Sequence, residues 1–272
     1  MVTDCHAHLD AVSLSGFLNS LKNIKKEARE GGGPQFRVIS NSTDVESSRK
    51  NIEIASSLPG LVIAFVGIHP QAVVEKGPGK VTKSNSEEAI KLFDNLVDNA
   101  RGIGEIGLDS KYGLEELQLE IFKRELEIAE SKPWLPISLH TRNTIEKVAE
   151  ILSSYQLSNR VLLHWFAGTD SELRKIQARG YYVSFGPALI FSKRLQGLAK
   201  AATEGLILAE TDSPLVFSSL MGSEPVSPFI ISSVIFKLSE VRNMSYDETM
   251  FVMEENAERY IQAQNSLRVK GE

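Results

Sequence analysis

The sequence predicts an α/β fold, a single (β/α)8 TIM barrel over residues 1–272, from three observations. Eight short apolar segments recur along the chain, segments with helical spacing separate them, and a length of 272 residues suits one barrel. Several of the eight segments are apolar almost throughout, as parallel strands covered on both faces should be. A doubly wound open sheet is the alternative, although it usually needs fewer strands.

The expected strands and helices alternate from one end of the chain to the other. The strands are residues 2–5, 36–40, 61–67, 102–107, 135–140, 160–165, 181–186 and 205–211. Helical spacing is found at residues 14–30, 86–100, 114–131, 143–155, 171–180, 192–202 and 227–241. Asp44 and Asp170 stand where helices would start, and three glycines at 31–33 indicate a helix stop. The extra C-terminal helix, 246–262, is expected to pack outside the barrel.

Composition and charge narrow the class of protein. The only cysteine is Cys5, so no internal disulfide is possible, which fits a reducing compartment. The first residues do not resemble an export signal, and no run of about 18 apolar residues is present. We therefore expect a cytoplasmic location and no membrane partner. The net charge of −5 disfavours bulk attraction of nucleic acid, so any nucleic-acid activity must use a local site.

All five histidines fall at the C-terminal ends of expected strands. His6 and His8 close the first strand, His69 follows the third, and His140 and His164 end the fifth and sixth. Barrels carry their chemistry at these ends. Such positions make up roughly a tenth of a barrel, so five random placements would all fall there with a chance on the order of 10⁻⁵, or 10⁻⁴ if the H-x-H pair counts once. The set therefore favours one shared site over unrelated structural histidines.

Carboxylates accompany the histidines at the same ends. Glu105 lies inside an apolar strand, where an unpaired carboxylate is costly, and a buried salt bridge is its structural alternative. Asp212 follows the eighth strand, with Glu210 beside it, and helix capping is the alternative for Asp212. Asp109 either belongs to the site or starts a loop, and Asp4 precedes the H-x-H pair as a candidate supporting group.

These residue types predict a metal centre. His6 and His8 lie two apart on a strand, so their side chains share a face and can reach one ion. Imidazole and carboxylate ligands suit Zn²⁺, Mn²⁺, Fe²⁺ or Mg²⁺, and a closed structural zinc site is disfavoured because no thiolate cluster exists. Six candidate ligands exceed the need of one tetrahedral ion. We therefore expect two divalent ions, Mg, Mn or Zn, that activate a water between them.

Six motifs carry a family resemblance, and they occur in order across nearly the whole chain. They are D-x-H-x-H at 4–8, GIHP at 67–70, GEIGLD at 104–109, HTR at 140–142, HWFAG at 164–168 and ETDSP at 210–214. Gln118, Phe122 and Asn256 add supporting matches. With these motifs the chain resembles the TatD family of metal-dependent deoxyribonucleases, within the wider amidohydrolase-like barrels.

The resemblance implies a role for each candidate residue. It implies that one ion is held by His6 and His8 and the other by His140 and His164, with Glu105 as the bridge. It implies that Asp212 binds metal and acts as general base on the attacking water, and that His69 and Arg142 contact the substrate phosphate. Arg142 suits this role because its planar fork donates twice, and pairing with an acidic helix at the surface is its structural alternative.

The sequence departs from the family pattern around the expected mouth of the barrel, here called the rim, and not at the candidate metal ligands. The loop after the eighth strand lacks the basic cluster often seen in the family, SKYG at 110–113 replaces an aromatic pair, and Trp165 stands where cysteine is common. A less basic rim should weaken the binding of long polymers more than that of small phosphodiesters.

Three functions compete at the level of sequence. The first is a metal-dependent phosphodiesterase acting on DNA or a smaller phosphodiester, exonuclease-like in the 3′–5′ direction on single-stranded ends. Trp165, Phe166, Phe185 and Phe217 near the mouth are candidates for stacking on bases, and core packing at the strand ends is the structural alternative for each of them. The second is a deacylase or amidohydrolase acting on aminoacyl-tRNA or an N-acyl compound with the same centre. The third is a metal-binding scaffold without activity, and no obligate protein partner is expected for any of them.

Overall fold

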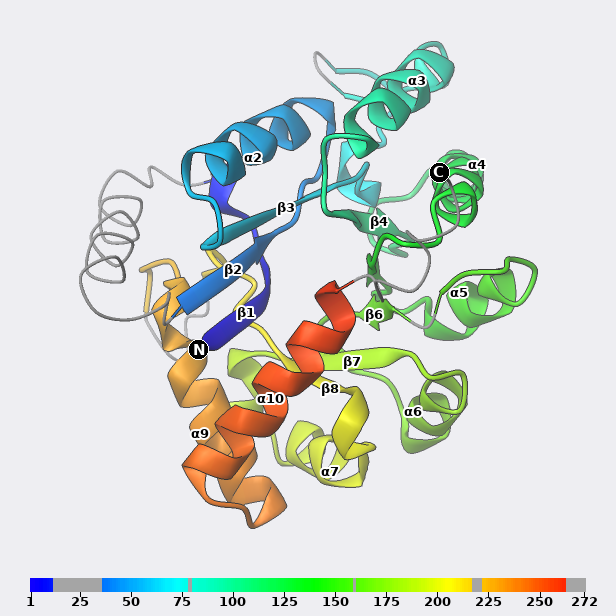
Figure 1. The fold of residues 1–272 in the computed structure, drawn as a ribbon. Helices are drawn as coiled ribbons and strands as arrows, with labels where there is room; N and C mark the ends of the chain where they lie inside the picture. Colours follow the sequence, from blue (N-terminus) through cyan, green and yellow to red (C-terminus); the bar gives the residue numbers. More distant parts are fainter. Residues whose placement is uncertain (12–35, 78–79, 159, 217–221, 263–272) are drawn as a thin grey trace, which may run out of the picture.

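The eight strands of the computed structural model form one parallel barrel in chain order, which confirms the predicted fold over the doubly wound alternative (Figure 1). The structure describes residues 1–11, 36–77, 80–158, 160–216 and 222–262. The strands are β1 Val2–Ala7, β2 Phe36–Ser40, β3 Val62–Val66, β4 Gly102–Gly107, β5 Ile137–His140, β6 Val161–Leu163, β7 Tyr182–Phe185 and β8 Ile207–Ala209. Nearly every strand residue is buried, because helices cover the outside of the barrel and side chains fill its interior.

The barrel closes where the last strand meets the first. Each strand from β1 to β8 pairs with the next, and the seam is completed by backbone bonds just beyond β8. Asp212 N donates to His6 O at 2.8 Å, and His8 N donates to Ser213 O at 2.7 Å. The seam therefore joins two of the segments that carry candidate ligands.

Helices separate the strands, and all those described except the one after β2 lie where the spacing predicts, with small shifts at their ends. They are α2 Val45–Ser57, α3 Ser86–Val97, α4 Glu115–Ser131, α5 Ile145–Leu152, α6 Asp170–Gln177, α7 Lys193–Ala201, α9 Ile231–Arg242 and α10 Tyr246–Ile261. Asp44 caps α2 as expected, whereas Thr169, one residue before Asp170, caps α6 in a capping box with Glu172. The helical segment expected at 14–30 and the glycines at 31–33 lie outside the described residues.

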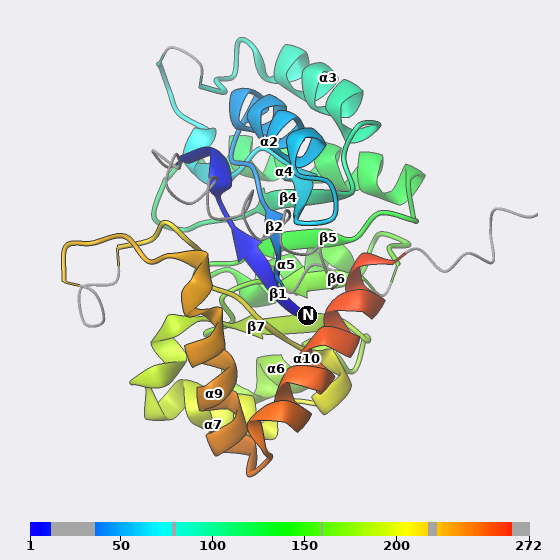
Figure 2. The same ribbon diagram turned by 60° about the vertical axis from the view of Figure 1, so that its left-hand side comes forward.

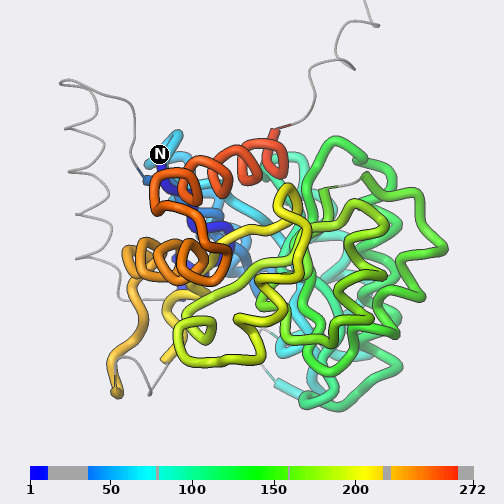
Figure 3. Tube along the Cα trace, turned by 90° about the horizontal axis from the view of Figure 1, so that it is seen from below, coloured from blue at the N-terminus to red at the C-terminus, as the bar shows by residue number. Residues whose placement is uncertain are grey.

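The extra C-terminal helix is confirmed, and it has a specific place in the fold. Rather than adding to the outer ring, α10 lies across the N-terminal end of the barrel, beside the start of β1 (Figures 1 and 3). Ala257 and Tyr260 are buried there against Cys5 and Leu208. The helix therefore covers the barrel floor and leaves the C-terminal ends of the strands open.

Polar contacts fix this helix to the barrel floor. Arg37 of β2 places its Nη2 atom 2.9 Å from Glu254 Oε1 and 2.6 Å from Glu258 Oε1, and Thr3 Oγ1 donates to Glu254 Oε2 at 2.9 Å. On its other side α10 packs against α9 (Figure 2). No helix among the residues that the structure describes has the length and apolar character needed to cross a membrane.

Candidate metal centre

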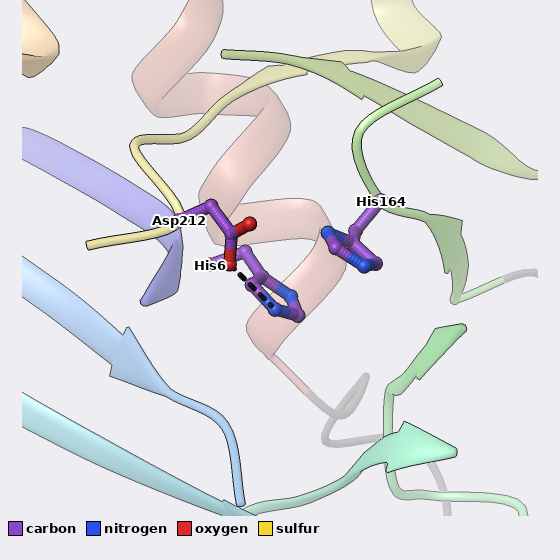
Figure 4. A group of neighbouring side chains, drawn as sticks. All are labelled: His6, His164 and Asp212. Atoms are coloured by element: carbon purple, nitrogen blue, oxygen red, sulfur yellow. Dashed lines mark ion pairs between the residues drawn. The ribbon is translucent and has the colours of Figure 1, made fainter. Parts of the chain in front are cut away.

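Six predicted ligands meet at the C-terminal end of the barrel. His6 lies in β1 and His8 directly follows it, Glu105 lies in β4, and His140 is the last residue of β5. The remaining two are His164, one residue after β6, and Asp212, three residues after β8. Figure 4 shows His6, His164 and Asp212 converging from three elements, with the His6 and His164 rings stacked at a centroid distance of 3.8 Å.

Glu105 sits between two sets of imidazoles. Its Oε2 atom lies 3.3 Å from both His6 Nε2 and His8 Nε2. Its Oε1 atom lies 2.6 Å from His140 Nδ1 and 2.7 Å from His164 Nε2. The two carboxylate oxygens therefore face different histidine pairs, with His69 Nε2 as a further neighbour 3.3 Å from Oε1, and this is the arrangement a bridging ligand needs.

Asp212 joins the half of the site formed by β1. Its Oδ1 atom lies 3.2 Å from His8 Nε2 and 3.8 Å from His6 Nε2. The backbone at Asp212 has a left-handed φ of 52°, and it follows Thr211, whose amide and hydroxyl both donate to the buried Asp4 carboxyl. Asp4 thus supports the turn that presents Asp212 and links it to β1.

His69 lies closer to the centre than a rim residue would. Its Nδ1 atom accepts a hydrogen bond from Gln71 N at 3.0 Å, and its Nε2 atom lies 3.3 Å from Glu105 Oε1. The side-chain groups whose ligand atoms lie within 4.8 Å of one another are His6–His164–Asp212, His6–His8–Glu105 and His69–Glu105–His140. By position His69 can contact either an ion or a substrate.

Polar groups behind the β1 histidines orient their rings. His8 Nδ1 lies 3.0 Å from the Asn41 carbonyl oxygen, which only accepts, so Nδ1 carries the proton and a neutral ring offers Nε2 to the centre. His6 Nδ1 lies 2.9 Å from Ser138 Oγ. The sequence motifs do not identify Asn41 or Ser138. The signal for Ser138 was its place two residues before His140 on the same strand, where side chains share a face.

Carboxylates stand behind the other two histidines. His140 Nε2 lies 2.7 Å from Asp109 Oδ2, while Asp109 Oδ1 accepts from Lys111 N at 2.8 Å, so Asp109 both contacts the site and starts the loop after β4. Glu210 is fully buried, accepts from Ser184 Oγ, and has Oε1 3.6 Å from His164 Nδ1. Those two facing atoms have no hydrogen-bond partner among the described residues, so a small movement would join them. Such carboxylate–histidine pairs raise the basicity of metal ligands.

Charge within the cluster is balanced by protons on the histidines. Burial opposes ionisation of Glu105, but His164, His69 and His6 hold the pKa of that carboxyl well below its usual range. Burial also opposes the charge on His8, yet hydrogen bonds with Asp212 and Glu105 raise the His8 pKa to about 10. Divalent cations would replace these protons as counter-charge. Imidazole and carboxylate donors without thiolate fit hard or borderline divalent ions.

Arg142 pairs with a buried acid of the site. Its Nε atom donates to Asp109 Oδ1 at 3.1 Å and its Nη2 atom lies 2.9 Å from Asp109 Oδ2. Burial raises the pKa of Asp109, but hydrogen bonds from His140, Lys111 N and Arg142 outweigh it and lower the value to about 2. The Arg142 side chain is 41% exposed, so the guanidinium stands between the centre and solvent.

A groove of about 1070 Å³ runs outward from His140, His164 and Asp212. It passes over the segments that follow β4, β5 and β6, and Trp165 and Arg142 line it. Of the two readings of Phe166 and Phe185, base stacking at the mouth is wrong and core packing is right, because both side chains are 1% exposed and belong to the core. Phe217 lies outside the described residues.

Comparisons with known proteins concern the sequence and the fold of the whole chain. A family model described as TatD related DNase matches residues 3–262. Deoxyribonuclease TATDN3 of Homo sapiens is 27% identical over 266 residues, covering 94% of this chain and 93% of its own. The uncharacterized metal-dependent hydrolase YabD of Bacillus subtilis is 25% identical over 268 residues, covering 95% and 98%. The crystal structure of YjjV, a TatD homolog from Escherichia coli K12, superposes with a TM-score of 0.79 at 22% identity, covering 96% and 97%.

Proposed function

The chain belongs to the TatD related DNase family of metal-dependent hydrolases, as its motifs indicated, and on this premise we propose that it is a divalent-metal-dependent phosphodiesterase acting on DNA. The observation that carries the proposal is the position of Glu105, whose two oxygens each face a histidine pair. Human TATDN3 bears the name deoxyribonuclease, which supports DNA as the substrate. The finer proposal is exonuclease-like removal of nucleotides from single-stranded 3′ ends.

Two divalent ions, Mg, Mn or Zn, would be held by the six ligands. One site would consist of His6, His8 and Asp212, the other of His140 and His164, and Glu105 would contribute to both. When bound, such ions polarise the phosphoryl group and lower the pKa of a water. Proton transfer from the attacking water and binding of the substrate phosphate are left to the protein's own side chains.

Asp212 is suited to take the proton from the attacking water, whereas Glu105 is suited to hold the two halves together. The Asp212 side chain is 19% exposed and that of Glu105 is 3% exposed, so only Asp212 reaches solvent. Burial raises the pKa of Asp212, but hydrogen bonding with His8 outweighs it and keeps the carboxyl ionised. An ionised carboxylate with access to water is what a general base requires.

Arg142 and His69 would bind the substrate phosphate. The Arg142 guanidinium already forms two parallel contacts with the Asp109 carboxylate, a geometry that also suits two phosphoryl oxygens. This feature favours a phosphodiester over the alternative substrate, an ester or amide of a deacylase, whose single carbonyl oxygen cannot use the whole fork. To contact the phosphate, the Arg142 guanidinium must either bind the phosphate and Asp109 at the same time or give up its contacts with Asp109.

One panel of substrates tests the proposal. The metal-loaded protein is offered single-stranded DNA labelled at either end, duplex DNA, a generic phosphodiester and an acyl ester, with an Asp212→Asn variant as the matched control for contaminating nucleases. We expect single-stranded DNA to be shortened from its 3′ end and the phosphodiester to be hydrolysed, both far faster than by the variant. Hydrolysis of the ester alone would replace the nuclease proposal with the deacylase alternative.

A further inference from the structure

The groove beside the centre has one aromatic wall, formed by Trp165. The residue directly follows His164, and its side chain is partly exposed where the groove begins. The groove is large enough for a nucleotide, since ligand pockets typically occupy about 300–1,000 Å³. Because His164 is a proposed ligand, a group lying on Trp165 would be next to the scissile bond.

The indole of Trp165 is fixed in place before any ligand binds. Its backbone N donates to Ser184 Oγ at 3.2 Å, and its φ of 46° is left-handed. The six-membered ring lies against Gly186, where an added Cβ would come within 2.8 Å of Trp165 Cζ3. Only glycine permits this approach. A ring held in this way loses little conformational freedom when a ligand stacks on it.

The charge of the groove does not suit a run of phosphates. Its cationic lining residues among those described are Arg142, Lys147 and Arg194, against six acids, Asp109, Glu115, Glu146, Glu150, Glu172 and Asp212. Arg142 pairs with Asp109, Lys147 pairs with Glu115, and Arg194 Nη1 donates to the carbonyls of Ala167 and Gly168. Arg194 is therefore the one described lining cation without a carboxylate partner in these contacts, and the six acids outnumber the three cations, so the groove attracts a second phosphate weakly.

We infer that the Trp165 indole stacks on the base of one nucleoside flanking the scissile phosphodiester, and that the groove accepts this single uncharged nucleoside rather than a length of DNA backbone. The inference rests on the proposed function and names its substrate class, a terminal nucleotide or a small nucleoside phosphodiester. Stacking supplies affinity without base-specific hydrogen bonds, so every base is accepted.

A thermodynamic cycle between Trp165 and the base tests the inference with the metal-loaded protein. The substrates are the dinucleotide thymidylyl-thymidine and the two analogues in which one sugar lacks its base. The variants are Trp165→Ala, Trp165→Gly, which suits the left-handed backbone, and the conservative Trp165→Phe. Trp134→Ala is the matched control, because Trp134 is 53% exposed and precedes β5 at the opposite end of the barrel.

Removing one of the two bases should lower kcat/KM of the wild type and of Trp134→Ala about 5- to 150-fold, the range of one base–aromatic stack. In Trp165→Ala and Trp165→Gly the same removal should change kcat/KM by less than about twofold, and Trp165→Phe should keep most of the penalty. If Trp165→Ala and Trp165→Gly show the same penalty as the wild type, the inference is overturned. Loss of a merely structural Trp165 would lower kcat/KM for all three substrates by the same factor and leave the penalty unchanged.

The substrate set also separates this inference from the proposed function. If the wild type hydrolyses all three dinucleotides equally, the phosphodiesterase proposal stands and the stacking inference fails. If it hydrolyses neither these nor DNA, both fail. At physiological salt, kcat/KM for a single-stranded oligonucleotide of about 20 nucleotides should be within about threefold of kcat/KM for the dinucleotide. A strong preference for the oligonucleotide would overturn the single-nucleoside groove and indicate further phosphate contacts.

Discussion

Replacing Glu125 with glutamine should stabilise the protein at neutral pH, by an amount that grows as the pH rises. Glu125 lies in α4 with its side chain fully buried. Its Oε1 atom accepts from Ile68 N at 2.8 Å, and Oε2 has no hydrogen-bond partner among the described residues. Burial therefore raises the pKa of this carboxyl well above its usual range, against the smaller opposing effect of the Ile68 hydrogen bond.

The sign of the pH effect follows from linkage. A raised pKa means that the folded state keeps a proton that the unfolded chain loses above about pH 4.3. The free energy of unfolding therefore falls by up to about 1.4 kcal/mol for each pH unit between the unfolded and folded pKa values. Over the two pH units between pH 5 and pH 7 the loss through Glu125 can reach at most about 2.7 kcal/mol, which is twice the slope per unit. Glutamine keeps the Oε1 acceptor for Ile68 N but has no proton to lose.

Urea unfolding of the metal-free wild type and Glu125→Gln at pH 5, 6 and 7 measures this effect. The titrating groups of the metal centre are common to both proteins, so they cancel in the difference. Glu127→Gln on the same helix is the matched control, because Glu127 is 54% exposed and its difference from the wild type should stay within about 0.5 kcal/mol. A Glu125→Gln difference that does not change with pH would refute the reasoning.

Three further predictions concern the centre. Asp212→Asn should retain bound metal, measured by elemental analysis, yet lose at least about 10²-fold in kcat, the low end for a general base; wild-type turnover would remove Asp212 from that role. Arg142→Ala should raise KM for a phosphodiester more than it lowers kcat, and an unchanged KM would contradict phosphate binding. Activity should fall as the pH drops towards and below about 6.5, the usual histidine pKa, because histidine must be neutral to bind metal. Burial opposes the charge on His140 and His164, but Glu105 raises both pKa values, so the fall should begin above that pH, and a higher metal concentration should shift it to lower pH. A pH–rate profile flat to pH 5 would count against histidine ligation.

The sequence predicted the barrel and the meeting of its ligands because parallel strands bring their C-terminal ends to one edge. Residues as far apart as His6 and Asp212 could therefore be assigned to one site from their place at strand ends. Orientation was harder to predict. The left-handed backbone at Trp165 interrupts the alternation after β6, so Trp165 lines the groove and Phe166 is buried in the core.

Helix α2 shows a different reason why prediction from the sequence fell short. Its inward residues are Ser47, Ser48 and Asn51, so the apolar period that identified the other helices is weak there, and only its cap, Asp44, was recognised. Asn51 Nδ2 donates to the Asn41 carbonyl at 3.0 Å, the same oxygen that faces His8. The polar face of α2 therefore supports the metal centre, a role that requires the tertiary structure to be seen.

The most direct test of the metal-dependent mechanism is to strip the protein with chelator and add Mn²⁺ back while bound ions and cleavage of single-stranded DNA are measured on the same samples. We expect no cleavage by the stripped protein and recovery that follows the binding of about two ions per chain. Undiminished cleavage in excess chelator would contradict it.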